Sequence, residues 1–162
     1  MMGLFLEDFR EGQRFDLGTY VFNEEAISAF SSAFVPVGFH TDTAAAAEGI
    51  FGGTVAAGWH ICCGWMARFV ATNSHERERV AAAGGVLPEI GPSPGISNLR
   101  WPAPVHAGDA IHYGVTITGA RALKSRPGWG MVAIAADGRK ADGTTVMSFA
   151  GNVMVALKGS GS

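Results

Sequence analysis

Charged residues are scarce in this sequence, and the scarcity limits what the protein can bind. They make up only 16% of the 162 residues, whereas about 25% is usual for a soluble domain. The 12 lysines and arginines do not outnumber the 14 aspartates and glutamates, and no basic run is long enough to neutralise a phosphate backbone. The composition therefore argues against a nucleic-acid partner.

Hydrophobic residues, by contrast, reach 48% of the chain. A chain of this length is expected to fold as one domain with one core. Such a high apolar share predicts that the domain buries a large apolar surface, part of it between subunits. We therefore expect a homo-oligomer.

Cysteine is almost absent, and its placement excludes two kinds of site. Cys62 and Cys63 are adjacent, so they can neither link distant segments nor form a spaced set of metal ligands. We expect both to be reduced and buried as small apolar side chains, and we expect no metal site.

A basic leader followed by an apolar run is also lacking. Glu7 and Asp8 appear before any stretch of signal-peptide length, which predicts a cytoplasmic protein. The weakly charged stretch 50–67 is long enough to cross a membrane, but it contains four glycines and His60. A buried core helix is the better interpretation, and no membrane partner is expected.

Helical signals dominate the first half of the chain. Asn23 precedes two glutamates, as an N-cap should, and Asp42 or Thr43 caps the turn that follows. Asn73, with Glu76 three positions on, predicts the start of another helix. The longest predicted helix is apolar on nearly every side, so it must be buried nearly all round. The predicted helices span 23–33, 44–48, 54–71 and 73–84.

After residue 85 the apolar pattern changes to a period of two, which is typical of strands. Together with an early strand, the predicted strands span 14–22, 96–101, 109–123, 130–136 and 145–157. One long apolar helix and one antiparallel sheet predict an α+β fold in which the sheet wraps the helix. We expect one domain over 1–158 and a flexible tail over 159–162.

Several polar residues are candidates for chemistry, each with a simpler explanation. His60 and Cys63 have helical i, i+3 spacing and could pair as base and nucleophile, but residues inside a buried helix more often serve packing. Three basic residues in a turn region could bind a phosphate, although such charges are usually just solvated. These are Arg121, Lys124 and Arg126. The remaining histidines, His75, His106 and His112, are interpreted as structural or surface residues.

His40 is a stronger candidate. Pro36 and Gly38 hold the backbone out of regular structure just before it, and polar side chains on such loops are often functional. Phe51, Gly52 and Gly53 then lead into the long helix, whose first backbone N–H groups are free to face a ligand oxygen. A proton-transfer group and an oxyanion site are the minimum requirement for acting on a thioester.

The sequence resembles the MaoC-like dehydratase family, relatives of the R-specific enoyl-CoA hydratases. Similar segments run in the same order along almost the whole chain: LEDFREGQRFDLGTYVFNEEAISAF, FHTD, FGGTVAAGWH, LRWPAPVHAGD and SRPGWGMV. The resemblance implies a single hotdog domain, in which an antiparallel sheet wraps a long central helix. It also implies a dimer with sheets joined edge to edge, coenzyme A thioester substrates and no cofactor beyond that coenzyme A.

The resemblance also implies roles for individual residues. Family members usually carry an aspartate five residues before the catalytic histidine, and Val35 occupies that position before His40, with Pro36 next to it. The oxyanion donor, a backbone N–H eighteen residues after the histidine, falls on Gly58. A position often held by a small polar residue is here Met66. The predicted substrate-binding residues are Val35, Phe39, Gly53, Trp59 and Met66.

Val35 leaves three functions open, because valine can neither accept nor donate a proton. The first is an enoyl-CoA hydratase or 3-hydroxyacyl-CoA dehydratase in which His40 is the base, with Asp16, Glu48 or a carboxylate of the partner subunit as a substitute acid. The second is an acyl-CoA binding protein without catalysis. The third is a hotdog thioesterase, which lacks a carboxylate near the expected pocket.

Overall fold

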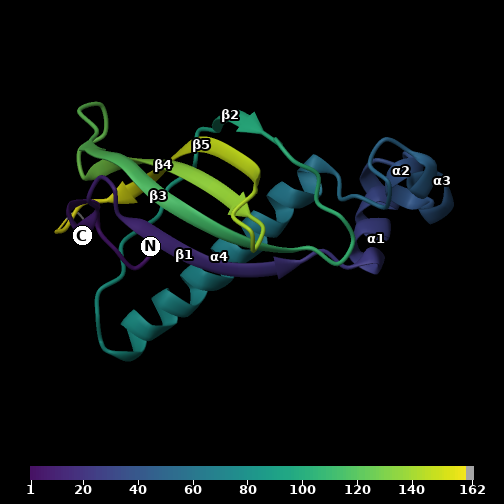
Figure 1. Cartoon of the computed structure of the whole chain (residues 1–162). Coiled ribbons are helices and arrows are strands. Elements are labelled where there is room, and N and C mark those ends of the chain that lie inside the picture. Colours follow the sequence, from purple (N-terminus) through teal and green to yellow (C-terminus); the bar gives the residue numbers. More distant parts are fainter. Residues whose placement is uncertain (160–162) are drawn as a thin grey trace.

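The computed structural model describes residues 1–159 and forms one antiparallel sheet beside a long helix (Figure 1). Over this range the five strands have the order β1-β3-β4-β5-β2, and every neighbouring pair is antiparallel. The strands are β1 Arg14–Val21, β2 Ile96–Arg100, β3 Ala110–Ala122, β4 Trp129–Arg139 and β5 Thr145–Ala156. The helices are η1 Leu6–Asp8, α1 Glu24–Phe34, α2 Gly38–Thr41, α3 Thr43–Glu48 and α4 Gly58–Ala82. The α+β prediction is confirmed; residues 160–162 of the predicted tail lie outside the described range.

Two of the predicted caps are present. The side chain of Asn23 accepts a hydrogen bond from Ala26 N at 2.8 Å and begins α1. Asp42 accepts from Ala44 N at 2.9 Å and begins α3. These local signals placed both helices correctly because each cap satisfies donors that the first helical turn leaves free.

The prediction for the central helix was wrong at both ends. It begins at Gly58 rather than near residue 54, and it continues to Ala82 without the predicted break. Asn73 does not cap a new helix, because its side chain is buried and serves tertiary contacts. Its Nδ2 donates to Phe69 O at 2.7 Å, and its Oδ1 accepts from Met2 N at 2.7 Å.

One side of α4 packs on the sheet, and the opposite side is open in the single chain. Ile61, Trp65 and Phe69 join the core with the inward residues of β3, β4 and β5. Trp59 and Met66, by contrast, are 61% and 51% exposed. The prediction that this helix is buried nearly all round was therefore wrong for the isolated chain.

The two cysteines also differ from expectation. Cys63 is exposed, and Cys62 is only partly buried. Both are free thiols, and burial raises the pKa of Cys62. They lie toward the open side of α4, so only Cys62 contributes to packing around the core.

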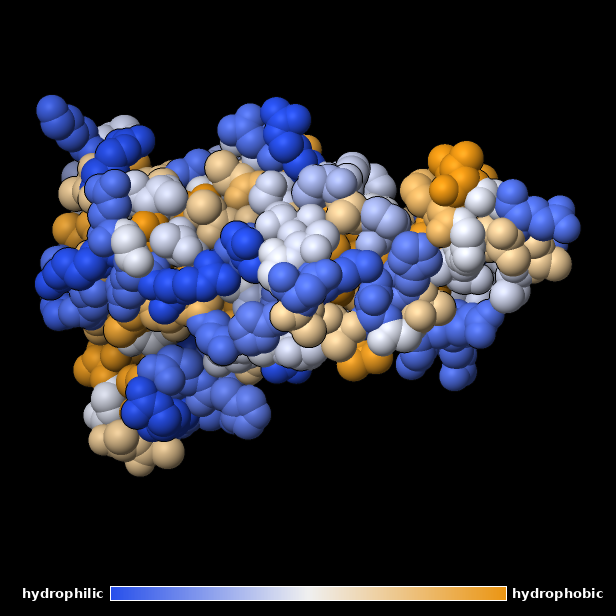
Figure 2. Space-filling view, in the orientation of Figure 1, coloured by the Kyte–Doolittle hydropathy of each residue, from blue (hydrophilic) through white to orange (hydrophobic). Residues whose placement is uncertain are grey.

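Helices α1, α2 and α3 form a separate lobe at one end of the sheet, beside the first turn of α4 (Figure 1). Apolar residues lie on the surface of this lobe (Figure 2), and they include Phe34, Val37 and Ile50. Of the helices formed by residues 1–159, none combines the length and apolar character that a membrane span requires.

Tyr113 fixes the first turns of α4 against the sheet. It is fully buried on β3, and its hydroxyl donates to Ile61 O at 2.8 Å. Close approach is possible because Gly64 and Gly138 lie against the ring, where a Cβ would come within 3.0 Å and 2.6 Å of Tyr113 atoms. Burial raises the pKa of Tyr113, which keeps the phenol protonated as a donor.

Replacing Tyr113 by phenylalanine is expected to lower the free energy of unfolding by about 1 kcal/mol, because the buried hydrogen bond is lost. Urea unfolding followed by circular dichroism measures the change. Tyr20→Phe is the matched control, since the Tyr20 ring is half-buried and its hydroxyl has no hydrogen bond within residues 1–159. Equal losses in the two variants would contradict this role of Tyr113.

Candidate functional site

A cavity of about 370 Å³ lies where the lobe meets the start of α4. It is enclosed by three segments: α2 with the loop after α3, the first turn of α4, and the chain that follows β2. Its lining is mostly aromatic and aliphatic. The lining residues are Phe39, His40, Phe51, Val55, Ala56, Gly58, Ile61, Trp101, Pro102, Ala103 and Pro104. We call it the histidine cavity.

His40 is the ionisable residue of this cavity. It lies on the short helix α2, which begins at Gly38, so the prediction that an irregular loop presents it was wrong, and it is only 8% exposed. Its Nδ1 lies 2.6 Å from the backbone oxygen of Val55. A carbonyl can only accept, so Nδ1 carries the proton and the neutral ring has an unprotonated Nε2. This arrangement leaves Nε2 able to accept a proton from a ligand or water.

The carbonyl that orients His40 is itself held by neighbouring backbone. Ala56 N donates to Val105 O at 2.8 Å, and Ala107 N donates to Thr54 O at 3.0 Å. These bonds pair residues 54–56 with the segment before β3 like a short ladder. The histidine ring therefore rests on fixed backbone rather than on a mobile side chain.

Gly58 contributes backbone to the same cavity. It is the first residue of α4, a helix of 25 residues, so its N–H has no acceptor within the helix. The indole of Trp101 lies directly against its Cα: a Cβ at this position would be 2.6 Å from Cε2 of Trp101. The first turn of α4 thus offers N–H donors and partial positive charge next to His40.

No carboxylate lines this cavity among the described residues. Val35 is half-buried at the end of α1 and does not line the cavity. Asp42 is engaged in capping α3. Asp16 lies on β1 beside His112, with 3.1 Å between its Oδ1 and Nε2 of the imidazole, and it lines a different groove. Neither Asp16 nor Glu48 lines the cavity.

A second cavity, of about 350 Å³, lies along the open side of α4 against β2 and β5. We call it the apolar cavity, because its lining is almost entirely apolar. Trp59 and Met66, two of the predicted substrate-binding residues, line it. Phe39 lines the histidine cavity, whereas Val35 and Gly53 line neither of the two.

His60 belongs to an aromatic cluster between α4 and α1. Its ring stacks on Phe30 with 4.6 Å between centroids and meets Phe22 edge to face at 5.0 Å. Burial lowers the pKa of its imidazole, and its buried Nδ1 has no partner within residues 1–159. This packing orients the lobe that carries His40, while Cys63 lies exposed elsewhere on α4. The pairing of His60 with Cys63 as a catalytic dyad finds no support.

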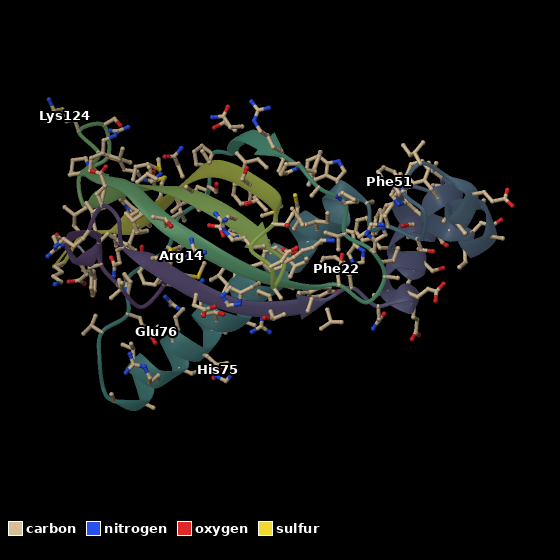
Figure 3. All side chains as sticks on the ribbon, in the orientation of Figure 1. Arg14, Phe22, Phe51, His75, Glu76 and Lys124 are labelled. Atoms are coloured by element: carbon tan, nitrogen blue, oxygen red, sulfur yellow. The ribbon has the colours of Figure 1, made fainter. Side chains whose placement is uncertain are left out.

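The basic cluster predicted as a possible phosphate site lies far from the histidine cavity. Figure 3 shows Lys124 at one end of the sheet and Phe51, which lines the cavity, at the other. Arg126 lies over the ring of Trp129 at 5.4 Å from its centroid. Across residues 1–159, no group of three or more His, Cys, Asp or Glu side chains is placed to hold a metal ion.

The other histidines have local contacts. His106 donates from Nε2 to Phe51 O at 3.0 Å and so ties the segment before β3 to the loop above the cavity. His75 is exposed near the end of α4 (Figure 3). The site residue that sequence reasoning missed is Trp101. Its only sequence signal was its place in the segment LRWPAPVHAGD.

Gly58→Ala tests the contact between Gly58 and Trp101. A methyl group at 2.6 Å from the indole must displace it, so we expect a loss of about 1–3 kcal/mol in unfolding free energy. Gly38→Ala is a matched control, because Gly38 begins α2 and its nearest neighbour would be 3.9 Å away. The control is expected to be neutral or stabilising. Thermal and urea unfolding measure both, and a stabilising Gly58→Ala would contradict the contact.

Comparison with solved structures identifies the fold and the family. No protein-family profile matches the chain, and the search of curated proteins found no match. A crystal structure of the MaoC-like dehydratase from Rhodospirillum rubrum shares 31% sequence identity and a TM-score of 0.76, covering 96% of this chain and 99% of that one.

More distant structures share the fold alone. The unliganded R-hydratase from Pseudomonas aeruginosa is 19% identical with a TM-score of 0.66, over 96% of this chain and 88% of that one. A Mycobacterium tuberculosis protein with a double hotdog fold is 17% identical with a TM-score of 0.75. This chain matches 46% of that protein with 99% of its own length, as a single hotdog would. The predicted hotdog fold is confirmed, and the identity to the R. rubrum protein over nearly the full length of both chains makes this chain a member of the MaoC-like dehydratase family.

Proposed function

We propose that the protein hydrates an enoyl thioester, or dehydrates the matching 3-hydroxyacyl thioester, with His40 as its acid–base group. One observation carries the proposal: the hydrogen bond from Nδ1 of His40 to Val55 O leaves Nε2 basic in a cavity that Gly58 also lines. The name of the family and the R-hydratases among similar structures support the reaction class. The substrate would be carried on coenzyme A, and no separate cofactor is proposed.

A single histidine can carry out both proton transfers of the reaction. Nε2 of His40 takes a proton from water as the water oxygen bonds to Cβ of the enoyl group. The electron pair of the double bond moves toward the thioester oxygen, where the N–H of Gly58 stabilises the enolate. The imidazolium then returns its proton to Cα. In the reverse direction the same groups remove water from a 3-hydroxyacyl thioester.

Val35 supports a second candidate function, acyl-thioester binding without turnover. The family's usual carboxylate is absent there, and His40 is the lone ionisable residue lining the cavity among those described. Loss of a general acid or base typically slows an enzyme about 10²- to 10⁴-fold. The two functions share one binding site and differ in rate.

Paired variants test the hydratase proposal. His40→Ala is expected to lower kcat/KM for enoyl-CoA hydration about 10²- to 10⁴-fold, because proton transfer is lost. Val35→Asp is expected to raise kcat by about 10²-fold or more while KM changes little, because it restores a carboxylate at the family position. Loss of absorbance at the enoyl thioester band measures the rates across chain lengths.

Val37→Asp is the matched control for the gain of function. It adds the same charge two residues further on, at an exposed position that is not the family's carboxylate position, whereas Val35 is half-buried. A wild-type rate no higher than that of His40→Ala would remove the hydratase proposal. Binding of acyl-CoA by that same inactive protein would then favour the second function.

We also propose a homodimer joined through the β2 edge of the sheet. β2 pairs only with β5 within residues 1–159, so its other side is free to pair with a second copy. Exposed apolar residues lie on this side of the molecule, including Ile96 at 48% and Met66 at 51% exposure. Both also line the apolar cavity, so the partner subunit would border that cavity in the dimer. The opposite edge, β1, carries two charged residues, Arg14 and Asp16, whereas β2 carries one, Arg100.

Light scattering coupled to gel filtration tests the dimer. The wild type is expected at about twice the 16.9 kDa chain mass. Ile96→Lys is expected to shift the protein toward monomer at micromolar concentration, because it places a charge in the apolar contact. Val86→Lys, at a 77% exposed loop position, is the control and leaves the mass unchanged. A monomeric wild type would contradict the proposal.

A further inference from the structure

The histidine cavity and the apolar cavity adjoin at a pair of tryptophans. Trp101 lines the first cavity, and Trp59 lines the second. Their indole rings meet edge to face, with 5.7 Å between centroids. Rings at this separation are in van der Waals contact, so an alkyl chain, which needs about 4 Å between carbon centres on each side, cannot pass between them.

The two tryptophans are held very differently. Trp101 lies against Cα of Gly58, where the first turn of α4 backs its ring. Trp59 is 61% exposed in the single chain, and within residues 1–159 its only ring contact is with Trp101. An edge-to-face contact favours the closed arrangement by only about two- to twelvefold. Trp101 is itself 41% exposed, but Gly58 backs its ring, so it is the better held of the two, and Trp59 is the side chain that can turn away.

We infer that Trp59, closing on Trp101, sets the acyl chain length that the protein accepts. The inference rests on the proposed function, because a thioester oxygen at Gly58 N–H places the acyl carbons beside Trp101. A short acyl group fits within the histidine cavity while the pair is closed. A longer group must displace Trp59 to reach the apolar cavity, whose lining includes Met66, Phe69 and Val153.

The chemistry of the second cavity matches a hydrocarbon tail. Its lining is almost wholly apolar, and the few polar residues, such as Ser93 and Asn152, come from its rim near β2 and β5. Each methylene moved from water into such a space strengthens binding about fourfold. The wild type should lose part of this gain beyond the length at which Trp59 must move.

Calorimetric titration with saturated acyl-CoAs from four to twelve carbons tests the inference. Saturated thioesters cannot be hydrated, so the measurement does not depend on turnover. The affinity of the wild type is expected to fall behind once, by about two- to twelvefold, beyond about six carbons, where the acyl chain must open the tryptophan pair. Trp59→Ala is expected to gain about fourfold per methylene without this step, so that its ratio of ten-carbon to four-carbon affinity exceeds the wild-type ratio by about two- to twelvefold.

Two further variants distinguish the role of Trp59 in chain-length selection from general effects of substitution on affinity. Val70→Ala removes an exposed apolar side chain from the same helix but lines neither cavity, so its profile should match the wild type. Trp59→Phe keeps a smaller ring and should give an intermediate profile, and it remains informative where Trp59→Ala fails to fold. If the affinity of both Trp59 variants depends on chain length as in the wild type, or falls equally at every length, only the role of Trp59 in chain-length selection is overturned. Absence of binding by the wild type at every length overturns the thioester site as well.

Discussion

The site depends on one hydrogen bond, between Nδ1 of His40 and the carbonyl of Val55. It joins the short helix α2 to the segment that leads into α4, and it fixes the tautomer of the ring. Without it, His40 would be one more side chain on a four-residue helix that has little stability of its own. The ladder between residues 54–56 and the segment before β3 makes that carbonyl a rigid acceptor. The His40 ring is therefore held in one orientation although α2 itself is only four residues long.

Much of the fold followed from local sequence patterns, because period and capping are local. The alternation along β3 and the caps at Asn23 and Asp42 were sufficient to place those elements. The prediction that Asn73 caps a new helix failed for an equally physical reason. An asparagine before a glutamate has the same local pattern whether it caps a helix or is buried inside one, and its bond to Met2 N connects residues far apart in sequence. Tertiary contacts of that kind override a local signal.

The site was predictable only in part, for the same reason. The spacing of His40 and Gly58 carried enough information, through the family resemblance, to predict that they share a site, and both line one cavity. Trp101 reaches Gly58 from a distant segment after β2, so no spacing could indicate the contact. The separation of Trp59 and Met66 from His40, into a second cavity, is likewise a property of packing rather than of sequence order.

Replacement of the usual aspartate by Val35 separates two properties that family members combine. In the proposed function, the Gly58 backbone and the apolar walls would bind a thioester through contacts that need no carboxylate, and a drier cavity would strengthen the hydrogen bond to the thioester oxygen. Proton transfer, in contrast, would fall entirely to His40. The inferred role of the two cavities and the tryptophans between them in selecting an acyl group therefore does not depend on the rate of turnover.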